Sequence, residues 1–147
     1  MGSLHARVVT GHPDTELAVV VDPNEQTGRA VADRYGARWA ADPEGLGEVD
    51  AVIVAAATQY HHGIGVDIID RGLPLLMEKP LADRLTDAED LVSRSQQAGT
   101  PLMCGFLERY NPGLLTAFQL LENPVHIAAQ RHSPYVARIR TGVASDL

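Results

Sequence analysis

A formal charge of −7 over 147 residues, with no basic cluster, argues against nucleic acid and anionic membranes as partners of this chain. Its longest purely apolar run, residues 51–57, is too short to span a bilayer, and the first residues lack the pattern of a signal peptide. Cys104 is the single cysteine, so no internal disulfide can form, which fits a reducing cytoplasm. The length and the shares of apolar (45%) and charged (21%) residues are those of one soluble globular domain.

Short continuous apolar runs alternate along the chain with longer amphipathic stretches, which is typical of strands separated by helices. The first part of the pattern predicts, in order, a helix over 1–9, a strand over 17–21, a helix over 24–35, a weak strand over 37–40 and a turn or short helix over 43–47. The rest predicts a strand over 49–55, a helix over 61–71, a strand over 73–77, a helix from a capping box at 86–89 to Gly99, a strand over 101–105, a helix over 112–121 and a strand over 125–131.

Strands that are apolar throughout and separated by helices predict a parallel sheet with helices on both faces. With right-handed crossovers, this is a doubly wound, Rossmann-type α/β domain. The pattern opens on a helix with no strand before it, and it stops soon after a new strand begins. We therefore expect a sheet that lacks its first strand over residues 1–122, followed at 123–147 by the start of a second α/β domain.

Lys79 is the single lysine in a chain whose other basic side chains are all arginine. It follows the strand predicted at 73–77, and Pro80 keeps its backbone extended as it leaves that strand. The side chain then points to the crevice beyond the carboxyl ends of the strands, where open α/β folds bind ligands. A lysine can lose a proton or donate to a developing alkoxide, which an arginine does not readily do. A solvated surface lysine is the alternative, and position alone favours neither.

Asp22 ends the first predicted strand, where dinucleotide-binding folds place an acidic residue on the adenosine ribose. It lies 20 residues after Gly2, close to the spacing expected after the last glycine of a phosphate-binding turn. No lysine or arginine at positions 23–28 could neutralise a 2′-phosphate, so the carboxylate favours NAD over NADP. A turn-forming aspartate before a proline is the alternative, and the two roles are compatible.

Small residues at the end of the strand over 49–55, Ala56 among them, would let a flat cofactor approach the backbone. Thr58 and His61 follow directly. The adjacent His61 and His62 face different directions on a helix, and no cysteine or acidic ligand completes a set nearby. We therefore expect no metal site.

Arg109 follows the strand over 101–105 and begins a helix. A guanidinium there could bind a substrate hydroxyl or phosphate, although a solvated arginine at a helix start is an equal alternative. His5 and His12 are expected to be polar surface residues.

Five motifs in this order resemble the Gfo/Idh/MocA family of NAD(P)-dependent sugar and polyol oxidoreductases. They are the segments 4–7, 20–22, 55–61, 78–80 and 105–112. The resemblance runs over essentially the whole chain. It implies an N-terminal Rossmann domain followed by an open-sheet α/β domain that carries substrate specificity and oligomer contacts.

The resemblance also implies roles for single residues. Gly2 looks like the last glycine of the phosphate-binding turn, and the first strand and the other two glycines would precede it. Thr58 and His61 match positions that line the cofactor. Glu78 and Lys79 belong to the family's Glu-Lys-Pro signature, in which the lysine serves both the nicotinamide site and the substrate and the bond to proline is often cis.

Asp146 looks like the first residue of an Asp-x-x-x-His pair, and its histidine, the catalytic base, would lie three residues past Leu147. In this family the substrate hydroxyl gives its proton to that histidine, and the carbon that bears the hydroxyl gives a hydride to the nicotinamide. Meanwhile the ammonium of the lysine stabilises the oxygen. Lys79 and Asp146, with Arg109, are thus the candidate substrate-binding residues.

The sequence predicts a fragment of a cytoplasmic NAD-dependent dehydrogenase that acts on a sugar, polyol or nucleotide-sugar hydroxyl, homo-oligomeric when complete and inactive as 147 residues alone. Segments 105–112, 130–131 and 139–143 look most like the branch that acts on UDP-N-acetylglucosamine-type sugars. Inositol and simple-sugar dehydrogenases are close competitors. The alternative is a catalytically inactive remnant or partner module that keeps the family core.

Overall fold

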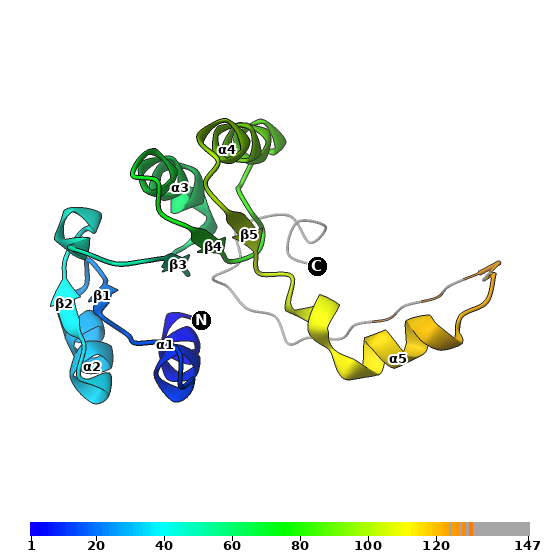
Figure 1. Ribbon diagram of the computed structural model, residues 1–147, viewed down its shortest axis with the longest axis horizontal. Helices are drawn as coiled ribbons and strands as arrows, with labels where there is room; N and C mark the ends of the chain where they lie inside the picture. The colour runs from blue at the N-terminus through cyan, green and yellow to red at the C-terminus, as the bar shows by residue number, and fades with distance from the viewer. Residues whose placement is uncertain (124, 127, 129, 131–147) are drawn as a thin grey trace.

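The computed structural model describes residues 1–123, 125, 126, 128 and 130, and its elements follow the predicted order (Figure 1). The helices are α1 (Gly2–Gly11), α2 (Glu25–Tyr35), α3 (His61–Asp70), α4 (Leu85–Ala98) and α5 (Pro112–Leu120), with short 3-10 helices η1 (Pro43–Leu46), η2 (Thr58–Tyr60) and η3 (Leu107–Tyr110). The strands are β1 (Val19–Val21), β2 (Arg38–Ala40), β3 (Val52–Val54), β4 (Leu75–Met77) and β5 (Leu102–Cys104). Every helix and strand predicted before residue 122 is therefore present, although the strands are shorter than expected.

Local signals explain both ends of α2. The side chain of Asn24 accepts a hydrogen bond from the backbone nitrogen of Thr27 and so caps α2, which ends at Gly36 with a φ of 70°. The capping box predicted at 86–89 is wrong. Helix α4 begins at Leu85, so Thr86 already lies within its first turn and cannot take the extended conformation of a capping residue.

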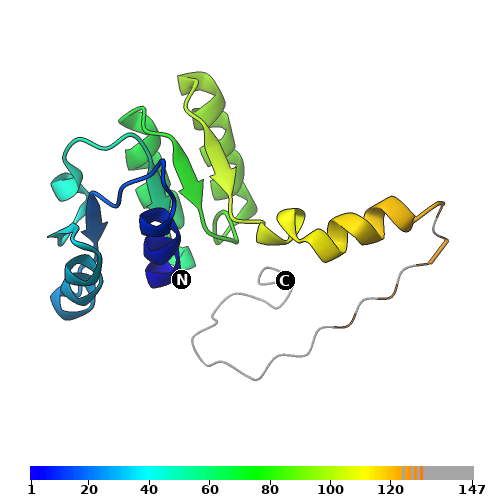
Figure 2. The same ribbon diagram turned by 60° about the horizontal axis from the view of Figure 1, so that its bottom comes forward.

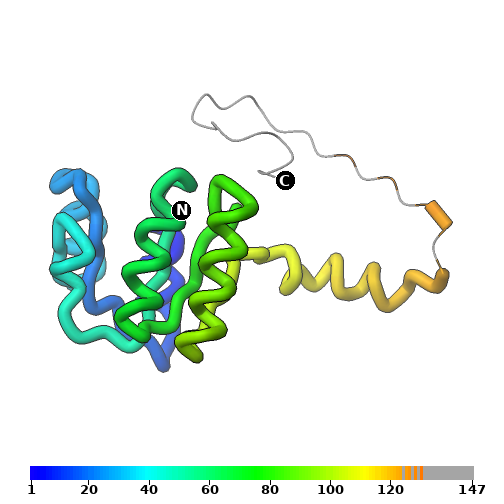
Figure 3. Tube along the Cα trace, turned by 90° about the horizontal axis from the view of Figure 1, so that it is seen from above, coloured from blue at the N-terminus to red at the C-terminus, as the bar shows by residue number. Residues whose placement is uncertain are grey.

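The strand predicted over 125–131 falls partly outside the described residues. Those of its residues that are described, 125, 126, 128 and 130, belong to no strand. Helix α5 precedes this region and extends away from the remainder of the fold (Figures 2 and 3). None of its residues is buried, and Phe118 is 67% exposed.

All strand pairs are parallel, but they form two sheets. One sheet pairs β1 with β2, and in the other β4 lies between β3 and β5. Helices α3 and α4 lie on one side of the three-stranded sheet and α1 lies on the other, while α2 lies beside β1 and β2 (Figure 1). The predicted doubly wound, Rossmann-type arrangement is confirmed.

The two sheets are separated where one more strand would join β1 to β3. The backbone nitrogen of Asp22 donates to a carbonyl of β2 (3.1 Å), and the carbonyl of Val54 accepts from the backbone of Glu78 after β4 (2.9 Å). Since successive residues of a parallel strand turn their backbone groups to opposite neighbours, those of Val21 and Ile53 face the other edges of their strands. In the described part of the chain, no strand pairs with these edges. The sheet therefore lacks a strand, as predicted.

The hydrophobic core lies between the three-stranded sheet and helices α3 and α4. Met77 and Leu91 are fully buried, and Ile68 is 1% exposed. The two helices approach closely at Gly65, where an added Cβ would lie 2.7 Å from a methyl group of Leu91. This packed half of the domain holds β4 in place, and the segment that follows β4 carries Lys79.

Candidate functional site

Parallel strands bring their carboxyl ends to one edge of the molecule. Asp22 follows β1, Ala56 lies two residues after β3, Lys79 lies two residues after β4, and Gly105 follows β5. The N-terminal end of α1 reaches the same edge (Figure 2), where His5 contacts Glu78. Residues from five separate segments thus lie along the edge where an open α/β sheet binds its ligand.

Lys79 leaves β4 in a backbone conformation fixed on both sides. The Glu78 nitrogen extends the sheet bonding by donating to Val54, and the Lys79–Pro80 peptide bond is cis, as the resemblance implied. The Lys79 side chain is half-buried. Its ammonium group is therefore carried by a backbone that is anchored in the better packed half of the fold.

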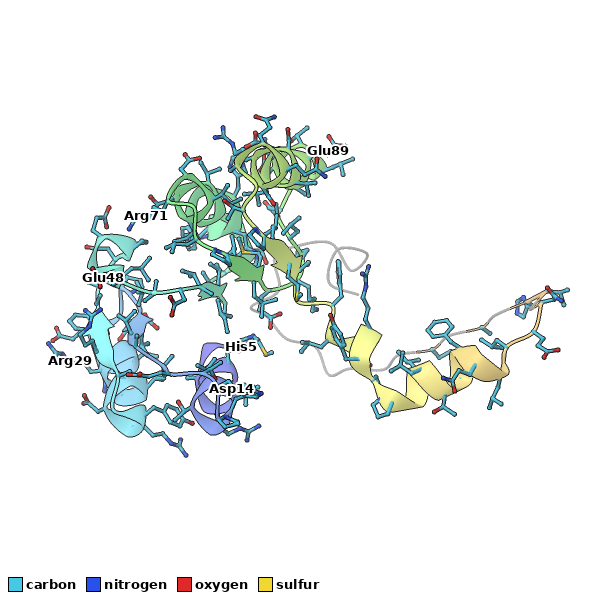
Figure 4. The ribbon with its side chains drawn as sticks, viewed as in Figure 1. His5, Asp14, Arg29, Glu48, Arg71 and Glu89 are labelled. Atoms are coloured by element: carbon cyan, nitrogen blue, oxygen red, sulfur yellow. The ribbon has the colours of Figure 1, made fainter. Side chains whose placement is uncertain are left out.

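The Glu78 carboxylate is held inside this edge. It is 6% exposed, its Oε1 lies 2.6 Å from Nε2 of His5, and its Oε2 accepts from the backbone nitrogen of Lys79 (3.1 Å). His5 was expected on the surface, and that expectation is wrong: its side chain is 16% exposed and points from α1 toward the sheet (Figure 4). The contact joins residues 73 positions apart, which apolar periodicity along the chain cannot show.

His61 links two other backbone segments of the site. Its ring is 1% exposed, with Nδ1 2.9 Å from the carbonyl oxygen of Pro80 and Nε2 3.0 Å from that of Ala56. Both partners are acceptors, so a neutral ring donates to one of them and only a doubly protonated ring donates to both. The ring thereby ties the loop after β3 to the segment after Lys79, and its predicted contact with the cofactor stays a prediction.

Asp22 shows the turn geometry that its sequence suggested. Its Oδ1 accepts from the backbone nitrogen of Asn24 (2.8 Å), and its carbonyl accepts from the indole nitrogen of Trp39 (3.1 Å). An added Cβ on Gly28 would collide with this indole and would lie 2.9 Å from Cβ of Asp22, so a glycine is needed there. These contacts fix Asp22 at the carboxyl end of β1 while leaving Oδ2 out of the turn.

The remaining predicted contact residues suit a flat, anionic ligand. Ala56 is exposed, and Thr58 is half-buried at the start of η2. Gly2 begins α1 with open space around its Cα, and the first turn of α1 contains no acidic residue. The positive end of the helix dipole is therefore available to a phosphate. With the Asp22 carboxylate for a ribose, these residues fit a dinucleotide.

Cys104 and Arg109 lie at the β5 side of the edge. Burial raises the pKa of the Cys104 thiol, so the thiol is protonated at neutral pH and is a poor nucleophile. Arg109 is exposed in η3, and its guanidinium lies 5.1 Å from the ring centre of Phe106. Its predicted contact with substrate stays a prediction.

The remaining features of the chain do not add to this edge. Asp146 lies outside the described residues. Within the described ranges, no three metal-binding side chains gather. A hollow lined by Glu48, Asp50 and Arg71 lies at the amino ends of β3 and β4, so it is separate from the site of Lys79 at their carboxyl ends.

Comparison with known families decides the class of the domain. Residues 1–106 match the model of the GFO_IDH_MocA oxidoreductase family, which has an NAD-binding Rossmann fold. The chain belongs to this family. Its match covers every strand of the two sheets and all the residues that gather at their carboxyl edge except Arg109.

Individual relatives agree with this assignment. Inositol 2-dehydrogenase 2 of Saccharopolyspora erythraea is 35% identical over 84% of this chain and 38% of its own length. The crystal structure of GenD2 from gentamicin A biosynthesis, in complex with NAD, matches with a TM-score of 0.79 and 34% identity over 82% of this chain and 35% of that one. UDP-N-acetylglucosamine 3-dehydrogenase GnnA of Acidithiobacillus ferrooxidans matches with a TM-score of 0.74 and 26% identity over 80% of this chain and 39% of that one.

The chain thus spans little more than a third of the length of these relatives. What it shares with them is the NAD-binding domain of a dehydrogenase family. In the described part of the chain, no helix combines the length and the apolar content needed to cross a membrane.

Proposed function

We propose that this chain provides the cofactor-binding domain of an NAD-dependent dehydrogenase that oxidises a hydroxyl group of a polyol, sugar or nucleotide sugar. The observation that carries the proposal is the position of Lys79 at the carboxyl edge, with Glu78 held by His5 and Pro80 held by His61. Residues 1–122 form the cofactor domain, and 123–147 begin the substrate domain.

Each residue of the proposed site binds a different part of the cofactor. The N-terminal end of α1 at Gly2 faces the phosphates, and Asp22 accepts hydrogen bonds from the adenosine ribose. Ala56 and Thr58 border the flat part of the ligand. Because a carboxylate at position 22 repels a 2′-phosphate and no lysine or arginine stands at positions 23–28, NAD is preferred over NADP.

Bound NAD supplies the acceptor for a hydride from the substrate carbon. The Lys79 ammonium donates a hydrogen bond to the substrate oxygen and stabilises the negative charge that develops there. The resemblance gives the proton of that hydroxyl to a histidine oriented by Asp146, and it gives Arg109 a contact with the substrate. Lys79 thus acts on the reacting oxygen and holds it in place.

The substrate class follows from the relatives. One of them is named an inositol dehydrogenase and another a UDP-N-acetylglucosamine dehydrogenase, so we propose a cyclic polyol or a nucleotide sugar. We also propose that the whole protein is a cytoplasmic homo-oligomer, since the resemblance assigns oligomer contacts to the second domain and the lone cysteine suits a reducing compartment.

One observation favours a second candidate function. Among the described residues no strand pairs with the facing edges of β1 and β3, so the sheet lies in two parts, which suits a non-catalytic remnant or a partner module. Such a module would keep the fold without binding the cofactor.

NADH binding and turnover separate the two functions. The native gene product is titrated with NADH, and the fluorescence of the nicotinamide is recorded. NAD reduction is then followed with myo-inositol and UDP-N-acetylglucosamine as probe substrates. We expect saturable NADH binding and NAD reduction with one of the two probe substrates. A native product that leaves NADH fluorescence unchanged contradicts the dehydrogenase and supports the module.

A further inference from the structure

The carboxylate of Glu78 joins helix α1 to the backbone of Lys79. His5 donates from Nε2 to Oε1, and Oε2 accepts from the Lys79 nitrogen. Since Glu78 is 6% exposed, both bonds lie largely out of water, where hydrogen bonds to a charged group are strong. A movement of this carboxylate therefore moves the backbone that carries the ammonium group.

The carboxylate has little room to move elsewhere. A Cβ added at Gly105 would lie 3.2 Å from Oε2 of Glu78 and 3.3 Å from its Cα, so the segment after β5 closes the space on that side. His5 closes the side toward α1. Helix α1 and the segment after β5 thus hold one rotamer of Glu78 between them.

We infer that His5 is a positioning residue, which through Glu78 fixes where Lys79 presents its ammonium group. The inference rests on the proposed role of Lys79 in the dehydrogenase reaction. His5 belongs to the helix whose N-terminal end faces the cofactor phosphates in that proposal. The contact therefore couples the phosphate end of the site to its reacting end.

Two substitutions separate positioning from simple packing. His5→Phe keeps a ring but removes the donor, whereas His5→Gln places an amide donor near the position of Nε2. The matched control is His12→Phe, because His12 is exposed beyond the end of the same helix. All variants are made in the native gene product and studied well below their thermal unfolding midpoints.

The first readout is kcat per NADH-binding site with a substrate that the wild type turns over. Removing a residue that orients a reacting group commonly costs about 10- to 100-fold in activity, and we expect this loss in His5→Phe. The Kd for NADH should change much less. The kcat of His5→Gln should recover to within about threefold of wild type, and the kcat of His12→Phe should equal that of wild type.

The second readout needs no cofactor. A brief pulse of acetic anhydride acetylates accessible amines, and peptide mass spectrometry gives the rate at Lys79. In His5→Phe this rate should differ from that of the wild type, because the backbone of Lys79 is no longer held. His5→Gln should restore it.

A kcat for His5→Phe within about twofold of wild type overturns the inference. An equal loss in His5→Phe and His5→Gln that follows the folded fraction also overturns it, since it assigns His5 to stability alone. Failure of the wild type to bind NADH contradicts the proposed function instead. In that case the acetylation rates still decide whether His5 positions Lys79.

Discussion

The two halves of the sheet differ in how deeply their side chains are buried. The three-stranded half has β4 paired on both sides and packs against α3 and α4, with Met77 and Leu91 fully buried. In the two-stranded half no strand residue is fully buried, and Val19 and Val21 reach the core as partly buried side chains. The better packed half therefore carries Lys79, the proposed reacting group, and the less packed half carries Asp22, the proposed ribose acceptor.

This difference shows how a site can depend on contacts outside the sheet. No strand of the described part bridges β1 and β3. The bond from His5 to Glu78 reaches across from α1, which packs beside α2, to the end of β4. Side chains thus hold the two halves in a common arrangement where the backbone ladder is interrupted.

Removing the ammonium group of Lys79, the proposed reacting group, should have the largest effect on turnover. We expect Lys79→Ala to lower kcat by about 100- to 1,000-fold, because the developing charge on oxygen loses its donor. NADH binding and the fold should change little, since the side chain is not part of the core. The control is Arg34→Ala, an exposed cation at the end of α2. Near-normal turnover of Lys79→Ala would remove the lysine from the mechanism.

One truncation in each half tests the difference in packing. Leu91→Ala opens a cavity in the buried half and should lower the free energy of unfolding by about 2–5 kcal/mol. Val21→Ala, in the looser half, should cost only about 1 kcal/mol. Urea denaturation measures both. Equal losses would mean that the two halves are packed alike.

A smaller effect, on cofactor preference, is expected from replacing Asp22, the proposed ribose acceptor. Asp22→Ser removes a charged acceptor, and hydrogen bonds to charged groups contribute about 1.5–3 kcal/mol, so the preference for NAD over NADP should fall about tenfold or more. The ratio of kcat/KM for the two cofactors measures it. An unchanged ratio would place the ribose elsewhere.

The smallest effect concerns pH. Hydrogen bonds from His62 and then Arg94 lower the pKa of Asp90 at the α3–α4 surface. Because the pKa of Asp90 is lower in the folded state, these bonds stabilise the fold at pH values above the unfolded-state pKa of ~4. This stability is lost as pH falls through the folded-state pKa of Asp90. Because Asp90 is solvent-accessible, the gain is slight. Acidification should destabilise wild type somewhat more than Asp90→Asn, and the exposed control Asp33→Asn should follow wild type in urea titrations at pH 5 and pH 3.

The sequence could predict which residues lie at the carboxyl edge, because parallel strands end there together and Asp22 and Lys79 each follow an apolar run. It could also predict the missing strand, since the pattern opens on a helix. It could not predict the contact of His5 with Glu78, which depends on how α1 packs across the sheet. The capping box at 86–89 failed for a local reason, since Leu85 already belongs to the helix.

Protection of Lys79 by cofactor tests the central claim most directly, namely that this edge binds NAD with the nicotinamide beside Lys79. The native gene product is pulsed with acetic anhydride with and without saturating NADH, and peptide mass spectrometry gives the rate at Lys79. The account predicts that NADH slows acetylation of Lys79 and leaves the acetylation of a lysine-containing reference peptide in the same mixture unaffected. An unchanged rate at Lys79 while NADH is bound would place the nicotinamide elsewhere and contradict the account.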